Sequence, residues 1–426
     1  MKESTPDLGP LRPPLRKISI DRLIPGMYVE RIDRSWLLVP VFRNLIESDQ
    51  QVQRLREWDV REVIINTKKG IDLPSGQAEE TSDASPASLE PVDAVPLQEE
   101  LGRANNVYEQ ALASASRMMD AVRSGHSPDV GVAGAAVDRL MASILRNRDA
   151  LSSLTQLKEF NESTFQHCIR VCILSLVFGT RLGFTRSDLK TLGMGALLHD
   201  VGKMKLPEEL VRRPRPLTNE EFEHYRTHPL LGARLFDGAS RIEKASLLVL
   251  LQHHERCDGS GFPQGLTEDE ISRMAKLVMI VDTYDNLTTG REGGRKLTPS
   301  EALAWLRDWG AQSYDPVLVE EFVAALGLYP VGSFVRLSDN RLAIVTSVHH
   351  DPTMLPKVWV VYDDQHHILP DGVELDLADQ QAARPVSIVS SVLPEKIGFD
   401  LPGYARERGL VTGREAGFRS DHRRLS

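Results

Sequence analysis

The most informative residues of this sequence are histidines and aspartates at the ends of apolar segments. Of the twelve histidines, six lie between His167 and His254, and their spacing fits no single helix face. The segment ALLHDVGK brings His199 and Asp200 together where a strongly apolar helix is expected to end. Neutral imidazole and carboxylate together suit Fe, Mn or Zn better than Ca. The pair alone does not predict metal binding, so the inference depends on the residues that accompany it.

Further residues of the same types favour a shared site. His167 opens one apolar segment, His228 starts another, and His253 and His254 end a third. Asp282 interrupts the apolar stretch LVMIVDTYDNL, where an unpaired carboxylate would be costly to bury. An acid inside a helix that reaches an arginine or a backbone donor is the alternative explanation for Asp282. Taken together, the residues predict that several helices meet around metal.

The order of these residues resembles a known family. The pattern H…HD…H…HH…D, with HDVGK and HHERCDGSGFP, is similar to the HD-GYP branch of the HD-domain metal-dependent phosphohydrolases, whose signature is HHExxDGxGYP. The resemblance covers roughly residues 151–328. A small module before this region and the β-rich YPVGSFVRL segment after it look like a known subgroup of the family.

The resemblance implies a set of metal ligands, with one carboxylate, Asp200, bridging two metals. The corresponding residues are His167, His199, Asp200, His228, His253, His254 and Asp282. Consecutive helix residues point in different directions, so His253 and His254 are expected to line one binuclear site from two angles. Some relatives recruit a third metal with a glutamate where this chain has Ser163. We therefore predict two divalent ions, Fe or Mn, with Zn as an alternative.

Catalysis and substrate binding are also assigned through the resemblance. Two metals can hold a bridging hydroxide for in-line attack on phosphorus. Asp200 and Lys203 are the predicted catalytic residues, and the Lys203 ammonium is expected to hold a phosphate oxygen; a solvated helix-end lysine is its alternative. Arg291 and Asp285 are assigned to the substrate. Because GREGGRK replaces the family's DRPYR, a basic contact is either missing or shifted to Arg295.

The resemblance implies a phosphodiesterase of bacterial second-messenger signalling that hydrolyses cyclic di-GMP to pGpG and on to GMP. Without the resemblance, the residues support only a phosphohydrolase with a binuclear metal site. One alternative is a cyclic-dinucleotide sensor that acts through a protein partner, and another is an HD hydrolase of a different nucleotide. Phe262 replaces the tyrosine of GYP. Since this motif is linked in relatives to diguanylate cyclase domains, residues 253–263 are a predicted contact surface for such a partner or another signalling protein.

The elements that must position these residues are mostly helices. Helical spacing runs from Leu101 to about Leu328, whereas short β-rich runs precede it and period-two runs follow it. The predicted fold class is mainly α, an all-helical core with a small α/β module before it and a small β module after it. The predicted segments are a disordered tail (1–16), the α/β module (17–70), a flexible linker (71–100), connecting helices (101–150), the catalytic domain (151–328), the β module (329–378) and a tail (379–426).

Composition restricts the remaining choices. The formal net charge of −9 argues against general binding of nucleic acid. No apolar run approaches the length of a membrane span, so a cytoplasmic protein is expected, and the sequence leaves open whether it forms a homodimer. Three cysteines cannot build a disulfide framework, and Cys168 and Cys172, at helical spacing, are predicted to pack in the core.

Overall fold

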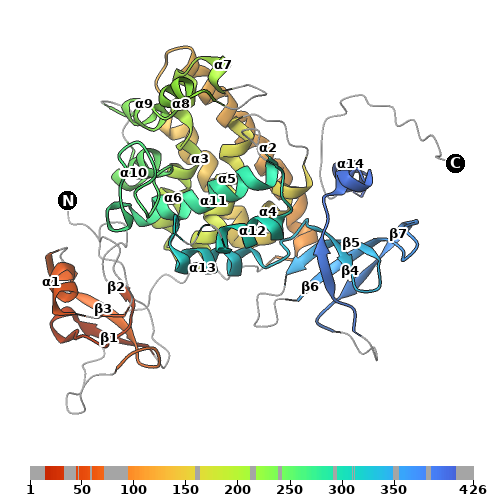
Figure 1. Cartoon of the computed structure of the whole chain (residues 1–426), viewed down its shortest axis with the longest axis horizontal. Helices are drawn as coiled ribbons and strands as arrows, with labels where there is room; N and C mark the ends of the chain where they lie inside the picture. The colour runs from red at the N-terminus through yellow and green to blue at the C-terminus, as the bar shows by residue number, and fades with distance from the viewer. Residues whose placement is uncertain are drawn as a thin grey trace.

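The structure is a computed structural model of the chain and describes most of the sequence. The described residues are 15–32, 45–46, 48–57, 60–71, 95–158, 164–211, 217–237, 242–290, 295–308, 310, 312–348, 355–379 and 385–408. Helices dominate them, with one small sheet toward each end of the chain (Figure 1), so the predicted mainly α fold class is confirmed. Among these residues, no helix combines the length and the apolar character that crossing a bilayer requires.

The N-terminal module is a three-stranded antiparallel sheet with one α-helix. Its elements are β1 (Leu15–Ser19), η1 (Ile20–Arg22), β2 (Val29–Ile32), α1 (Asp49–Glu57) and β3 (Glu62–Asn66). The strand order is β1-β3-β2, and Val63, Ile64 and Ile65 of the central strand are fully buried. Ile18 and Leu55 share a hydrophobic cluster with Val63 and Ile65 that includes no described residue of the helical region. The module therefore has a core of its own.

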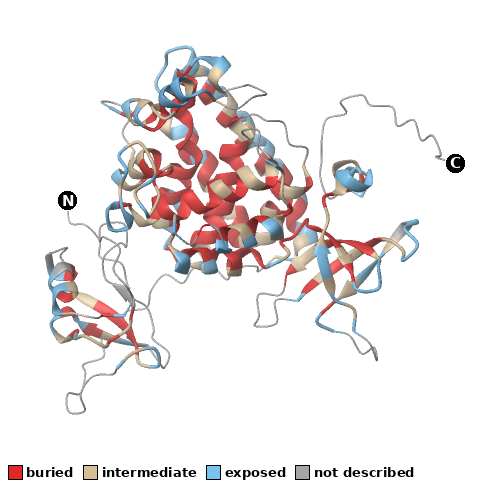
Figure 2. Cartoon of the chain, in the orientation of Figure 1, coloured by how far each residue is buried: buried red, intermediate tan, exposed pale blue. Residues whose placement is uncertain are grey.

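The middle of the chain forms a helical domain. Its elements are α2 (Leu97–Arg123), α3 (Val130–Arg146), α4 (Arg148–Leu157), α5 (Thr164–Arg181), α6 (Arg186–Leu198), η2 (Val201–Lys205), α7 (Glu208–Val211), α8 (Asn219–Tyr225), α9 (His228–Arg234), α10 (Lys244–Gln252), η3 (Glu268–Glu270), α11 (Arg273–Thr289), α12 (Pro299–Asp308) and α13 (Pro316–Leu326). Figure 2 shows that the buried residues concentrate in this domain. α5 and α11 are buried along most of their length.

Two glycines let α6 pack closely against its neighbours. A Cβ atom on Gly193 would lie 2.6 Å from the side chain of Val137 in α3, and one on Gly195 would lie 2.8 Å from Val249 in α10. Larger residues at these positions would push the helices apart. The glycines of LGMGALLHD therefore hold α6 deep in the domain, and its C-terminal end delivers the HD pair to the interior.

The C-terminal module is a five-stranded antiparallel sheet followed by a short helix. Its elements are β4 (Phe334–Leu337), β5 (Leu342–Val348), β6 (Pro356–Tyr362), β7 (Ile368–Asp376), β8 (Ile388–Ser391), η5 (Pro394–Ile397) and α14 (Leu401–Glu407). The strand order is β7-β6-β5-β4-β8. Phe334, Leu342, Phe399 and Leu401 belong to the same hydrophobic cluster as the helices, so this module packs directly against the helical domain.

The end of the chain differs from the sequence prediction. The sequence predicts a β module over 329–378 and a tail over 379–426, whereas the structure continues the sheet with β8 and adds η5 and α14 between Ile388 and Glu407. β8 has only four residues, and it is held by antiparallel pairing with β4, about fifty positions earlier. Pairing at that separation leaves no local periodicity to detect. Most of the predicted linker, residues 72–94, lies outside the described residues, as do residues 380–384 and 409–426 of the predicted tail.

Candidate metal centre

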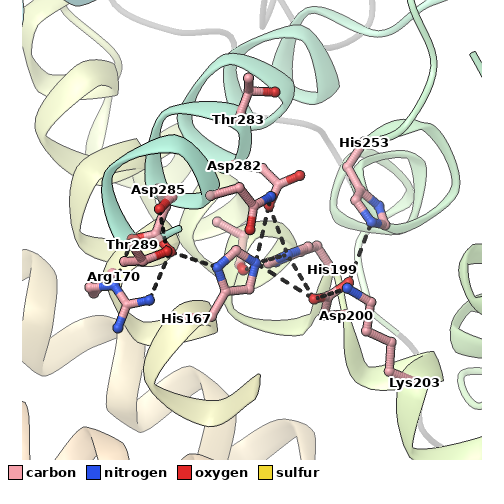
Figure 3. Close-up of polar contacts among 12 residues, drawn as sticks. His167, Arg170, His199, Asp200, Lys203, His253, Asp282, Thr283, Asp285 and Thr289 are labelled. Carbon is pink, nitrogen blue, oxygen red and sulfur yellow. Dashed lines mark hydrogen bonds and ion pairs between the residues drawn. The ribbon is translucent and has the colours of Figure 1, made fainter. Parts of the chain in front are cut away.

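The predicted ligand residues meet in the helical domain, and Figure 3 shows five of them together, namely His167, His199, Asp200, His253 and Asp282. In chain order they are His167 in α5, His199 and Asp200 after α6, His228 at the start of α9, His253 and His254 after α10, and Asp282 in α11. Their nitrogen and oxygen atoms form two groups, and within each group all candidate ligand atoms lie within 4.8 Å of one another. The structure thus brings together all seven, although no local segment contains them.

A backbone contact places Asp200 beside His228. η2 begins directly after Asp200, and a Cβ atom on Gly202 would lie 1.9 Å from the carbonyl oxygen of His228 and 2.5 Å from the backbone nitrogen of Gly232. Only a residue without a side chain lets η2 and α9 approach this closely. The glycine of HDVGK is therefore a packing requirement of the site.

Four of the imidazoles are oriented by hydrogen bonds from Nδ1. The acceptors are an Asp285 carboxylate oxygen for His167 (2.8 Å), the Ala196 carbonyl for His199 (2.7 Å), the Tyr225 carbonyl for His228 (2.8 Å) and the Leu250 carbonyl for His253 (2.9 Å). These oxygens only accept, so each Nδ1 carries the proton and each Nε2 keeps its lone pair. This is the tautomer and orientation in which histidine binds a metal ion through Nε2.

Asp200 lies between the two groups of ligands. Its Oδ2 atom is 3.6 Å from Nε2 of both His167 and His199, and its Oδ1 atom is 3.3 Å from Nε2 of His228 and 3.6 Å from that of His253. One carboxylate therefore faces a histidine pair with each oxygen. This arrangement suits a carboxylate that bridges two cations.

The site chemistry requires positive charge between the imidazoles. The Nε2 atoms of His167 and His199 are 3.1 Å apart, and those of His228 and His253 are 3.2 Å apart. Because the protons are on Nδ1, the two Nε2 lone pairs of each histidine pair face one another. This arrangement is repulsive unless a cation lies between the two nitrogen atoms. In addition, the Nε2 atom of His254 is buried without a hydrogen-bond partner. The residues therefore fit divalent metal ions.

Lys203 supplies one nearby positive charge. Its ammonium lies 2.7 Å from Oδ2 of Asp200, and both side chains are almost fully buried. Burial alone would raise the pKa of Asp200, but the Lys203 ammonium and the surrounding histidines lower this pKa well below its usual value. Asp200 is therefore an anion at neutral pH, as a metal-bridging ligand must be.

The metal-free protein is expected to lose stability as the pH falls below about 6.5, where unfolded histidines titrate. Burial lowers the pKa of His199 to about 3 and that of His228 to about 4. The unfolded chain therefore takes up protons first. The stabilisation that these two histidines contribute is complete above pH ~6.5, and it is lost as the pH falls toward their pKa values in the folded protein. Each group contributes up to about 1.4 kcal/mol per pH unit in that interval. Urea unfolding at pH 7 and pH 5 measures the change, and equal free energies of unfolding would contradict it.

Arg170 and Asp285 support His167 from the side away from the other ligands. The Arg170 guanidinium donates to both oxygens of Asp285, at 2.6 and 2.8 Å, and Asp285 accepts from Nδ1 of His167. Burial raises the pKa of Asp285, but Arg170 and His167 lower it below its usual range. The contacts of Asp285 are thus with a ligand histidine and an arginine, which favours a positioning role; the substrate contact assigned to it stays a prediction.

Replacing Asp285 by asparagine is expected to weaken metal binding about 10- to 100-fold, as is typical when a residue that orients a metal-bound histidine is changed. The amide has no negative charge with which to hold the Nδ1 proton of His167. Competition with a chromophoric chelator measures the affinity. Asp258→Asn is the matched control, because that carboxylate lies in the HHERCDGSGFP motif but is exposed and accepts from Ser260. Equal affinities in Asp285→Asn and wild type would rule out the positioning role.

The HHERCDGSGFP segment is fixed by a buried carboxylate and by ring stacking. Glu255 is fully buried, and its carboxylate accepts hydrogen bonds from the backbone of Gln264 (2.8 Å) and Leu266 (2.9 Å). The ring of Phe262 stacks on His254 with 4.6 Å between centroids. An aromatic residue at this position therefore packs on a predicted ligand without needing a hydroxyl. A partner contact by the motif stays a prediction.

Some predicted residues are not at the centre of the site. Arg291 and Ser163 lie outside the described residues. Arg295 is exposed, and it interacts electrostatically with Glu301 at the start of α12. Sequence reasoning missed Arg170, although its position three residues after His167, one helical turn, was a usable signal. Cys168 is buried as predicted, and its sulfur lies within 4.8 Å of the candidate ligand atoms of His199 and Asp200.

Comparison with known proteins agrees with this site. The HD domain family matches residues 139–318, and a domain of unknown function matches residues 15–133. A cyclic di-GMP phosphodiesterase of Pseudomonas aeruginosa is 35% identical over 82% of this chain and 85% of that protein. The cyclic di-GMP phosphodiesterase response regulator RpfG of Xanthomonas campestris is 32% identical over 43% of this chain and 50% of that protein.

Among solved structures, an HDG"Y"P protein from Bdellovibrio bacteriovorus covers 72% of this chain and 98% of its own, with 19% identity and a TM-score of 0.45. The Pseudomonas relative extends along most of both chains, and the matched HD domain contains every candidate ligand from His167 to Asp282. The chain belongs to the HD-GYP family of metal-dependent phosphodiesterases.

Proposed function

We propose that this chain hydrolyses cyclic di-GMP to pGpG, and then to GMP, at a pair of divalent metal ions. The observation that carries the proposal is the position of Asp200, whose two carboxylate oxygens each face a separate pair of histidine Nε2 atoms. Cyclic di-GMP is the substrate named for the Pseudomonas relative, which covers most of this chain. Fe and Mn are the expected metals, and Zn accepts the same ligands.

The chain's own residues prepare the site for a phosphodiester. When bound, two divalent ions supply an activated water for attack on phosphorus and neutralise the phosphate oxygens. His167, His199 and Asp282 would hold one ion, His228, His253 and His254 would hold the other, and Asp200 would contribute to both. The Lys203 ammonium, 2.7 Å from Oδ2 of Asp200, would contact a non-bridging phosphate oxygen as a point charge.

The proposed reaction consumes one water per phosphodiester. The new bond joins the water oxygen to phosphorus, the bond from phosphorus to the 3′ oxygen breaks, and the leaving oxygen takes a proton. The first step opens the ring to a linear dinucleotide with a 5′-phosphate, and the second releases GMP. Because no side chain has to become covalently attached to phosphorus, the absence of serine or cysteine among the seven ligand residues is consistent with this route.

The test combines metal analysis with product analysis. The full chain is purified without oxygen, its Fe, Mn and Zn contents are measured, and it is incubated with cyclic di-GMP and added Mn(II) or Fe(II). Near two metals per chain with pGpG or GMP formed is the expected result. Two metals with intact cyclic di-GMP would overturn the proposal, and incubation with a hybrid cyclic dinucleotide would then separate a different substrate preference from a sensor without turnover.

A further inference from the structure

A cavity of about 610 Å³ lies between the helical domain and the C-terminal module. This volume is in the range of small-molecule binding sites. α4, α5, α11 and α12 and the chain just before α12 provide one wall, and β4, η5 and the start of α14 provide the other. The seven candidate metal ligands are not among the residues that line it. Its size and its two walls from different modules raise the question of which molecule it holds.

The two walls carry opposite charges. Lys158, Arg170 and Lys296 come from the helical domain, whereas Glu395 and Asp400 come from the C-terminal module. Lys296 pairs with Glu395 at 2.9 Å across the gap. A ligand that suits these walls has an anionic group at one end and hydrogen-bond donors at the other.

The cavity also has neutral polar groups that lack protein partners. Ser333 is 1% exposed, and its hydroxyl is buried without a hydrogen-bond partner although the residue lines the cavity. The side-chain amide of Gln156, on the opposite wall, has no hydrogen bond to any described residue. The Ser333 hydroxyl is itself covered, whereas the Gln156 side chain is half-buried, so the Gln156 amide is the neutral polar group available to a molecule in the cavity.

One cavity residue is connected to the metal centre. Arg170 lines the cavity and holds both oxygens of Asp285, and Asp285 holds Nδ1 of His167. Each of these side chains is at most 3% exposed. An anion that draws the Arg170 guanidinium toward the cavity would therefore change how firmly His167 is oriented.

We propose that this cavity binds a guanine nucleotide as an effector of the enzyme. The phosphate meets Arg170 and Lys158, where it competes with Glu109, the present partner of Lys158. The N1–H and 2-amino donors of guanine face the carboxylates of Glu395 and Asp400. Guanine nucleotides have the required polarity, an anion at one end and paired N–H donors at the other. The choice of guanine rests on the proposed function, because GMP is the end product of that reaction. GMP that accumulates would then bind in the cavity and act on the metal centre through Arg170.

Calorimetric titration of the full-length, Mn(II)-loaded protein with GMP tests the site. Lys158→Met and Glu395→Gln are each expected to raise the Kd for GMP about tenfold or more, because each removes a hydrogen bond to a charged group. Asp376→Asn is the matched control for Glu395→Gln, since Asp376 is also a carboxylate of this module paired with a lysine, Lys357, but does not line the cavity. Its Kd is expected to equal that of the wild type.

Any of three results would overturn the proposal. The first is an equal Kd for GMP in wild type and in both cavity variants, and the second is loss of GMP binding in Asp200→Ala. The third is binding of AMP and inorganic phosphate as tight as that of GMP. Failure of the proposed function is seen separately: variant-sensitive GMP binding with intact cyclic di-GMP contradicts only the substrate. Hydrolysis of cyclic di-GMP without variant-sensitive GMP binding contradicts only the effector site.

Discussion

Replacing Asp200 by alanine is expected to abolish hydrolysis of cyclic di-GMP, with a loss in rate of about a thousandfold or more. Asp200 is the only described residue whose side chain faces both histidine groups with its two oxygens. Without it, neither group keeps its full set of ligands, and a metal ion stabilises the transition state by several kcal/mol, each ~1.4 kcal/mol being a factor of ten in rate. Metal content per chain and the rate of product formation are measured on the same preparation.

Asp138→Ala is the matched control for this substitution. Asp138 is also an aspartate of the helical domain, and it makes an exposed ion pair with Lys190, so its removal is expected to leave metal content and rate unchanged. Full activity in Asp200→Ala would refute the proposed mechanism. Retention of two metals in that variant would show that the carboxylate does not bridge them.

Replacing Lys203 by alanine is expected to lower kcat about 10- to 100-fold while metal content stays at the wild-type level. The basis is the worth of one hydrogen bond to a charged group, about 1.5–3 kcal/mol, expressed as a rate. Lys203 is not a metal ligand, but its buried ammonium lies beside Asp200. In the metal-loaded enzyme, the two ions replace the positive charge that Asp200 loses with the lysine, so the metals are retained.

The neighbouring Lys205 provides the control for Lys203. It lies on the same short helix, but its ammonium donates to the carbonyl oxygen of Val122 in α2. Lys205→Ala is expected to leave kcat unchanged. If Lys203→Ala loses its metals, the lysine has a structural role in holding the site. If the kcat of Lys203→Ala is normal, the lysine does not contact the reacting phosphate.

The candidate ligand residues could be selected from the sequence because their chemistry is unusual for their surroundings. Asp282 within an apolar helix, and His199 and Asp200 after the apolar segment that ends in Leu198, are costly to bury unless a group of opposite charge lies nearby. The positioning residues gave a weaker signal. The assignment of Asp285 to the substrate stays a prediction. The contacts of its two oxygens with Arg170 and His167 could not be predicted, because which way a helix residue points depends on packing that the sequence does not display.

The fold could also be predicted only in part. Long helical periodicity predicted the helical domain, since its apolar faces span many residues. β8 could not be predicted, because its four residues depend on pairing with β4. The cavity between the helical domain and the C-terminal module was equally inaccessible, because its walls come from segments separated by more than two hundred residues, from Gln156 to Pro402.

The candidate ligands lie on separate segments between His167 and Asp282, and neither histidine group comes from a single helix. A chain in which any of these helices is undocked therefore has an incomplete set. Metal ions bind the assembled state and shift the folding equilibrium toward it by mass action. Because proteases remove unfolded chains, metal supply is expected to set the lifetime of the protein as well as its rate of turnover. In a cell short of these ions, the enzyme becomes scarce as well as inactive.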